Sequence, residues 1–389
     1  MKFSIPFNGQ PDLLERINKE KVIEVYGKLT SDFIGGARPS LASPFVSKNR
    51  LISAIKESHK YGLKFNYLLN ATCLGNREWT FGGQKKIRNF LDWLSRIKVD
   101  ILTVSIPYLA ELIKKCYPHF EISVSNGAEI NSVAKAKEWE NFCVDEISLL
   151  VDINRNFSLL KNIRKNIKCK IEIIANQDTL FHCPLHNYHV LGGSHASQKN
   201  WQNFFIDYCR LWCSFKRISD PTNFIRADWI RPEDMHYYEE IGIDKLKLVD
   251  RSMITEAIVK IVDAYTESRY QGNLLDLLPH YSVNLLASKS NFLKKIKYFF
   301  RPFAVNVLKL YKAKKLMSDF DVYIDNRSLD GFMEFFLKND CDFMSCDHCG
   351  YCNEVAKKVV KVNPAYQENA FCLHRNFLDQ LISGDIFKY

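Results

Sequence analysis

Short runs of apolar, β-branched residues alternate with longer amphipathic segments from the beginning of the chain to about residue 275. Each run has the pattern of a buried strand, and the segments between runs have the spacing of helices. Nine runs fit this description: residues 3–7, 22–27, 64–71, 99–106, 120–125, 144–151, 169–176, 224–230 and 245–250. Because strands that alternate with helices pair in parallel, this rhythm predicts a TIM-like (β/α) barrel, regular or distorted.

A barrel of this type has eight strands, so nine runs are one too many. Either the first run caps the barrel or one of the nine is not a strand. Helical patterns occupy residues 85–97, 107–117 and 232–242, and Pro232 stands where a first helical residue is expected. We expect a barrel over residues 1–275 and, over residues 276–389, a basic helical arm followed by a Cys-rich metal-binding region.

Polar residues gather where the predicted strands end, which in such barrels is the side of the active site. Loops are polar in any case, and Asn or Asp often caps the following helix, so only the set as a whole indicates a pocket. The candidate catalytic residues at these ends are Asp228 and Asp250. The candidate substrate-binding residues are Asn126, Arg155, Asn176, Arg231, Lys247 and Arg251.

Length and composition exclude several classes of protein. The chain has 389 residues, 47% of them hydrophobic, which is enough for a large buried core. Its first residues lack the pattern of a secretory signal, and no apolar run is long enough for a membrane span. We therefore expect a cytoplasmic protein in which the twelve cysteines serve metal binding or catalysis rather than disulfides.

A cluster of four cysteines near the end of the chain has the spacing C-x4-C-x2-C-x2-C and comprises Cys341, Cys346, Cys349 and Cys352. Ferredoxin-type runs use similarly short gaps, whereas structural zinc sites more often have two C-x2-C pairs separated by a long loop. The spacing favours an iron–sulfur cluster and leaves zinc as the alternative. His348 could replace one of the ligands.

A second set of cysteines is spread over the predicted barrel and comprises Cys73, Cys183, Cys209 and Cys213. The first two follow predicted strands, and the last two are four residues apart, so on a helix their sulfurs share one face. Together they could hold a [4Fe–4S] cluster at the barrel rim, or they could be small buried core residues. His186 and His189, in the same region, are candidates for substrate or cluster contacts and for acid–base catalysis.

The net charge of +10 is concentrated in residues 289–318, which carry nine basic residues, no acidic residue and several aromatic ones. This composition predicts an amphipathic helical arm with a solvated basic face. The alternative is a contact with a polyanion or a membrane surface.

Signatures of metalloproteases, serine hydrolases, phosphate loops and dinucleotide sites are absent. The order of motifs over about residues 1–275 instead resembles peptidase family U32. The resemblance rests on FSIPFNG followed by VIEVYG, on FEISVSNGAEINSVAKAKEWE, on IEIIAN before a cysteine loop, and on WIRPEDMHYYEEIGIDKLKLVDR before VKIVDAYTESRY. Its most specific part is Lys247 and Arg251 followed by Tyr265 and Arg269.

This family includes proteins of oxygen-independent ubiquinone synthesis and of RNA hydroxylation, and its redox members bind a [4Fe–4S] cluster through four rim cysteines. The resemblance therefore implies such a cluster here, because the layout is matched by Cys73, Cys183, Cys209 and Cys213. Two features depart from the family pattern. Val249 and Asp250 replace glutamate and glycine, and Thr179 stands where a cysteine is expected.

These observations predict an iron–sulfur redox enzyme, an oxygen-independent hydroxylase or a related modifying enzyme, that acts on an anionic small molecule or RNA. An electron donor would serve it, and the cluster near the chain end would act as a relay. A U32-type peptidase is an alternative, although no nucleophile with its base is evident. A non-catalytic binding partner that uses the basic arm is another.

Overall fold

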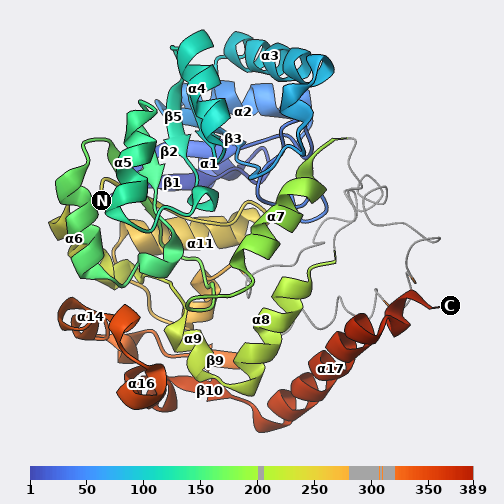
Figure 1. Ribbon diagram of the computed structural model, residues 1–389. Coiled ribbons are helices and arrows are strands. Elements are labelled where there is room, and N and C mark those ends of the chain that lie inside the picture. Colours follow the sequence, from blue (N-terminus) through green and yellow to red (C-terminus); the bar gives the residue numbers. More distant parts are fainter. Residues whose placement is uncertain (200–205, 280–305, 307–308, 310–319, 389) are drawn as a thin grey trace.

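The computed structural model describes residues 1–199, 206–279, 306, 309 and 320–388. At its centre is a closed barrel of eight parallel strands, in which each strand pairs with the next and β8 pairs with β1 (Figure 1). The strands are β1 (Lys2–Pro6), β2 (Val22–Gly27), β3 (Lys64–Leu69), β4 (Ile101–Val104), β5 (Glu121–Val124), β6 (Glu146–Ser148), β7 (Lys170–Ile174) and β8 (Lys245–Lys247). The predicted (β/α) barrel is confirmed.

Helices surround this barrel and supply its crossover connections. They are α1 (Leu13–Arg16), α2 (Lys48–Lys60), α3 (Phe81–Arg96), α4 (Pro107–Cys116), α5 (Val133–Asn141), α6 (Phe157–Asn166), α7 (His186–Ser197), α8 (Tyr208–Ser219), α9 (Thr222–Arg226), α10 (Met235–Ile241) and α11 (Thr255–Thr266). Several begin at a residue whose side chain accepts a hydrogen bond from the first turn, such as Ser47, Thr80 and Asp207. The three predicted helical patterns all lie on helices.

The predicted strand at residues 224–230 is wrong. Its first residues belong to α9. In the segment that follows, the backbone N–H of Ile230 donates a hydrogen bond to the carbonyl of Ala175, the residue after β7. The apolar pattern has another cause, because Trp229 is fully buried, donates its indole N–H to Phe224 and packs on Phe332. The first predicted run, by contrast, is barrel strand β1 and not a cap.

The interior of the barrel is polar at its lower level. One buried side chain from each strand forms what we call the polar ring: Ser4, Glu24, Asn66, Thr103, Ser123, Glu146, Glu172 and Lys245. The Lys245 ammonium lies 2.7 Å from Glu24 of β2, 2.8 Å from Glu146 of β6 and 3.2 Å from Glu172 of β7. Because β2 and β6 are not neighbours of β8, these contacts cross the centre of the barrel.

Residues 320–388, here called the tail, form a small antiparallel pair, β9 (Val322–Ile324) and β10 (Val360–Val362), and further helices. These helices are α14 (Glu334–Lys338), α15 (Cys346–Cys349), α16 (Tyr351–Val359) and α17 (Pro364–Ser383). The helix α16 packs on α9, and α17 lies along α8, where Phe377 and Leu378 contact Leu211 (Figure 1). The tail is therefore anchored to the side of the barrel that carries α8.

Two predictions concern the remaining parts of the chain. The basic arm, residues 289–318, lies outside the described residues except for Asn306 and Lys309. Within the part of the chain that the structure describes, no helix is both long and apolar enough to cross a membrane.

Candidate functional site

A cavity of about 270 Å³ opens at the C-terminal ends of the barrel strands, and we call it the rim cavity. Its floor consists of strand residues one level above the polar ring, namely Tyr26, Leu68, Ser148, Ile174 and Lys247. Loops after the strands and the helices α7 and α8 supply its walls. This is the position at which barrels of this type hold their active sites.

Three of the predicted rim cysteines line this cavity. Cys183 lies in the loop after β7, and Cys209 and Cys213 lie one turn apart on α8. Burial raises the pKa of Cys209 to about 12 and that of Cys213 to about 11, and the neighbouring thiols add to both effects. The three sulfurs therefore share one partly dehydrated environment.

The fourth predicted ligand, Cys73, is not among the residues that line the rim cavity. Its sulfur accepts a hydrogen bond from the backbone of Gly75, and its carbonyl accepts one from Gln198. Among the described residues, no group of three or more His, Cys, Asp or Glu side chains is arranged to hold a metal ion. The three cavity thiols fit the donor chemistry of an iron–sulfur cluster, but they are not preformed as a site for a single ion.

Both candidate histidines face the rim cavity from the first turns of α7. The Nε2 atom of His189 lies 3.4 Å from Asp207. Burial alone would raise the pKa of Asp207, but its hydrogen bond to this imidazole lowers that pKa below the usual value. Burial lowers the pKa of His186, and Asp152 offsets part of this effect. His186 is therefore held toward its neutral form, which can accept a proton or coordinate a metal.

Four cationic side chains line the rim cavity: Arg38, Arg210, Lys247 and Arg251. Lys247 lies 3.1 Å from Glu172 and over the ring of Tyr26, and Arg38 is paired with the candidate residue Asp250. Arg251 is only 5% exposed, and its Nη1 atom has no hydrogen-bond partner among the described residues. Because Asp178, Asp207 and Asp250 also line the cavity, its described cations exceed its carboxylates by one.

Some of the other predicted substrate-binding and catalytic residues line this cavity, and others lie outside its lining. Asn126 lines it and donates to the carbonyl of Leu149. Asn176 and Asp228 are buried outside its lining: Asn176 bonds the backbone of Val249, and burial raises the pKa of Asp228 well above its usual value.

Arg155 and Arg231 have structural contacts away from the cavity. Arg155 donates to the carbonyl of Ile225 and lies 4.6 to 5.2 Å from the aromatic rings of Trp229, Phe332 and Phe336. Arg231 forms a bidentate pair with Asp234 at 2.7 and 2.9 Å. Both guanidinium groups hold the segment after β7 against the tail.

The four tail cysteines lie on three consecutive short elements, a 3-10 turn at Cys341–Phe343 and the helices α15 and α16, and in the described structure they are not arranged as a metal site. Burial raises the pKa of Cys341 to about 12, and the charges of Cys352, Cys346 and Cys349 contribute to the increase. The same segment contacts the barrel rim through Asp342, which lies 2.8 Å from Asn156 and 2.9 Å from His182. Since His182 immediately precedes Cys183, the tail is attached to the loop that carries a cavity thiol.

Our sequence reasoning missed several residues of the rim cavity, among them Arg38, Asp178, Asp207 and Arg210. The sequence did contain evidence for Arg38 at the barrel rim, because this residue lies in the polar segment GGARPS that follows the end of β2. Asp207 and Arg210 had none beyond their nearness to Cys209. Their place in the cavity depends on how α8 packs, which the periodicity of α8 does not show.

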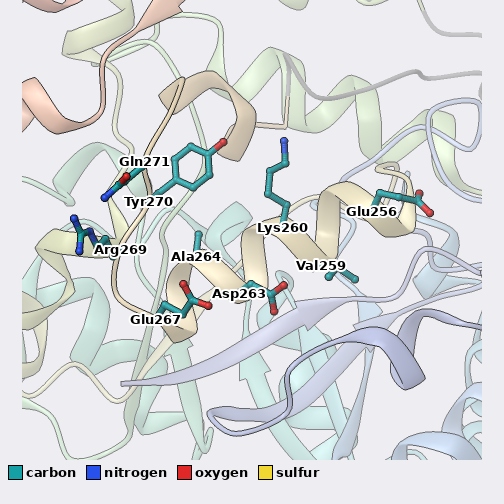
Figure 2. Close-up of a pocket in the computed structure, with 9 residues that line it drawn as sticks. All are labelled: Glu256, Val259, Lys260, Asp263, Ala264, Glu267, Arg269, Tyr270 and Gln271. Atoms are coloured by element: carbon teal, nitrogen blue, oxygen red, sulfur yellow. The ribbon is translucent and has the colours of Figure 1, made fainter.

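A second hollow lies on the outer surface of α11 and has a volume of about 580 Å³ (Figure 2). Its lining is made of helix and loop residues such as Glu256, Lys260, Glu267 and Arg269, with no cysteine or histidine among them. Lys260 there is paired with Asp276 at 3.4 Å. This open hollow offers no chemistry comparable to that of the rim cavity.

The fold and the site define a (β/α) barrel protein with a cavity at the strand ends that is lined by thiols and by charged side chains of both signs. The sequence model of Peptidase family U32 matches residues 33–183. The "Uncharacterized protease MJ1657" of Methanocaldococcus jannaschii is 30% identical over 352 residues, which are 90% of this chain and 93% of that protein. The chain belongs to peptidase family U32.

Solved structures resemble this chain more distantly. The structure of the U32 peptidase Mk0906 is 20% identical, with a TM-score of 0.49, and covers 64% of this chain and 92% of its own. FabK from Thermotoga maritima is 11% identical, with a TM-score of 0.26, and covers 44% of this chain and 50% of its own.

Proposed function

We propose that this protein is a cytoplasmic, iron–sulfur-dependent redox enzyme of family U32 that modifies an anionic substrate without oxygen, as a hydroxylase or a related modifying enzyme. The observation that carries the proposal is that three thiols and a guanidinium with an unpartnered nitrogen face one cavity at the strand ends, among the described residues. A reductive modification would require an electron donor as partner, whereas hydroxylation with water as the oxygen source would require an acceptor for the two electrons that leave the substrate.

In this proposal Cys183, Cys209 and Cys213 hold a [4Fe–4S] cluster at the rim cavity. A cluster bound there would transfer electrons between the substrate and the redox partner. Cys73 is the fourth ligand that the family resemblance implies, although it lies outside the cavity lining, so its contribution is tested separately below.

The remaining cavity residues have roles that follow from their own contacts. Arg251 and Lys247 attract and orient an anion, and the partly exposed Arg38 closes the cavity from the loop after β2. His186, held toward its neutral form by burial, is placed to accept a proton. His189 is oriented by its pair with Asp207.

The tail cysteines Cys341, Cys346, Cys349 and Cys352 are proposed to hold a second iron–sulfur cluster, with zinc as the alternative. Supporting this assignment are their spacing and the mutual effect of their thiols. Because Asp342 ties this segment to the loop of Cys183, a second cluster there would be suited to relay electrons to the rim.

Anaerobic purification with metal analysis tests these assignments. We expect absorption near 400 nm and about eight irons per chain, or about four irons with one zinc if the tail binds zinc. A Cys209→Ser, Cys213→Ser variant should lose the rim iron and keep the tail metal, and a Cys346→Ser, Cys349→Ser variant should do the reverse. The exposed Cys143→Ser is the matched control.

Two outcomes of this experiment are decisive. Protein without iron, or iron that the Cys209→Ser, Cys213→Ser variant retains in full, would refute the rim assignment. The Cys73→Ser variant tests the fourth ligand. Loss of rim iron in this variant would show that Cys73 is a ligand, and an unchanged iron content would show that it is not.

The alternative function is peptide hydrolysis, which the family name and the printed name of the relative from M. jannaschii favour. A cysteine nucleophile needs a lowered thiol pKa, whereas burial raises the pKa of each cavity thiol. Hydrolysis of a fluorogenic peptide library by metal-free protein, abolished in a cavity variant, would favour the peptidase over the redox enzyme.

A further inference from the structure

Arg251 is a buried cation that has no hydrogen-bonding partner within the part of the chain that the structure describes. It follows β8, lies at the rim cavity and is 5% exposed. Its Nη1 atom is buried and has no hydrogen-bond acceptor among the described residues. A buried charge without such a partner is costly to the folded state, so a side chain of this kind indicates a ligand that supplies the acceptor.

The charges around Arg251 favour the binding of an anion beside it. Burial lowers the pKa of Arg251, the nearby Arg38 lowers it further, and the carboxylate that acts against this, Asp250, is already paired with Arg38. The Tyr26 hydroxyl, which also faces this region, donates to the carbonyl of Leu248. Two guanidinium groups thus share one carboxylate, and the local charge is positive.

The other cations of the rim cavity lie near carboxylates. Lys247 has Glu172 at 3.1 Å, and Arg210 lies near both Asp207 and Asp178. The excess positive charge is therefore located at the β8 side, next to the loop that carries Arg38. The cavity thiols belong to the β7 loop and to α8.

We propose that Arg251, together with Arg38, binds an oxyanion of the ligand, a carboxylate or a phosphate, and so selects for anionic molecules at the β8 side of the rim cavity. A planar guanidinium matches either oxyanion with two parallel hydrogen bonds. The inference rests on the proposed function only in treating the rim cavity as the substrate site, and it requires no metal.

Calorimetric titration of the full-length, metal-free protein tests this site. The probes are inorganic phosphate, succinate and the uncharged succinamide. We expect phosphate or succinate to bind and succinamide not to bind, and the probe that binds more tightly identifies the oxyanion. Arg251→Met should weaken binding about 10- to 100-fold, the loss expected for a charge-assisted hydrogen bond, and Arg251→Lys should weaken it less.

Thermal unfolding separates a binding role from a structural one. If Arg251 serves the ligand, unliganded Arg251→Met should melt at a higher temperature than the wild type, because an unpaired buried charge has been removed, and the probe should no longer stabilise it. Lys260→Met, at the surface hollow of Figure 2, is the control and should bind the probes as the wild type does.

The inference is overturned by a wild type that binds neither anion, by wild-type affinity in Arg251→Met, or by a lower melting temperature in that variant. These readouts do not depend on iron. If the metal-free protein binds the anion but anaerobic purification yields no iron, this inference stands and the redox function is refuted. If the purified protein holds iron but binds no anion, only the oxyanion site is refuted.

Discussion

Lys245 and Arg251 are both buried, yet only Lys245 is surrounded by acceptors. Lys245 contacts three glutamates of the polar ring, which raise its pKa well above its usual value although burial alone would lower it. Glu24 and Glu146 respond differently to this shared cation. Burial would raise the pKa of Glu24, but the lysines lower it to about 2, whereas burial with the nearby glutamates raises that of Glu146 to about 7.

These pKa values predict how stability depends on pH. Glu146 binds its proton more tightly in the folded state than in the unfolded state, so its contribution to stability declines as the pH rises from about 4.5 to about 7. Glu24 acts in the opposite sense, and its contribution is lost as the pH falls from about 4.5 toward 2. Glu146→Gln should therefore gain stability relative to the wild type between pH 4.5 and 7, by on the order of a few kcal/mol.

Chemical denaturation of both proteins at a series of pH values measures this difference. The difference between the two proteins should build up within that interval and stay constant above it, because the glutamine side chain of the variant does not titrate. A wild type and a variant whose unfolding free energies run parallel from pH 4.5 to 7 would contradict the assignment. Glu121→Gln, at the partly exposed start of β5, is the control.

At the residue scale, the sequence predicted chemistry better where residues lie close together in the chain. The four-residue spacing of Cys209 and Cys213 and the strand-end position of Cys183 were sufficient to assign them to one region. The polar ring was missed, although its signal was present as a single charged residue within an apolar run, such as Glu24 in VIEVYG or Glu172 in KIEII. Only closure of the sheet shows that these charges meet.

At the scale of elements, α7 approaches the rim loop so closely that one of its residues has no space for a side chain. A Cβ on Gly193 would lie 2.3 Å from the carbonyl oxygen of Ala37, the residue before Arg38. Gly193→Ala should therefore displace α7 or that loop and destabilise the protein by roughly 1–3 kcal/mol. It should also weaken anion binding, because Arg38 moves with its loop.

Gly82→Ala in α3 is the matched substitution, since a Cβ there would meet no atom within 4 Å. Replacing an exposed helical glycine should stabilise the protein by about 0.5–1 kcal/mol. Denaturant unfolding measures both changes. Equal effects of the two substitutions would show that helix propensity alone, and not contact with Ala37, determines the outcome at Gly193.

Elements with a regular period were predicted well, and the one failure has a simple cause. The apolar residues of 224–230 resemble a strand because they are buried, but they are buried between the barrel and the tail. A segment that is buried by a distant part of the chain has the same apolar sequence pattern as a strand buried within a sheet. The tail that covers Trp229 lies about one hundred residues further along the chain.

At the scale of the molecule, the tail cysteines are attached to the barrel through a small polar contact. Asp340 and Asp342 accept hydrogen bonds from Asn156, and Asp342 also contacts His182. Asp340→Ala, Asp342→Ala should lower stability by about 1 kcal/mol or less, because Asp340 is only half-buried and Asp342 is exposed, but should increase hydrogen exchange over residues 339–352. Asp347→Ala is the control, and unchanged exchange in the double variant would show that other contacts hold the tail.

The polar ring also restricts how the strands can align as the barrel closes. A strand shifted by one residue would turn its charged side chain outward among the helices, and a shift by two would carry Glu24 or Glu146 out of reach of Lys245. Either misalignment isolates a charge in a dry environment, a penalty that a purely hydrocarbon interior would not impose. We therefore expect Lys245 to disfavour misaligned strands while the barrel forms. The shape of the rim cavity above it depends on the same alignment.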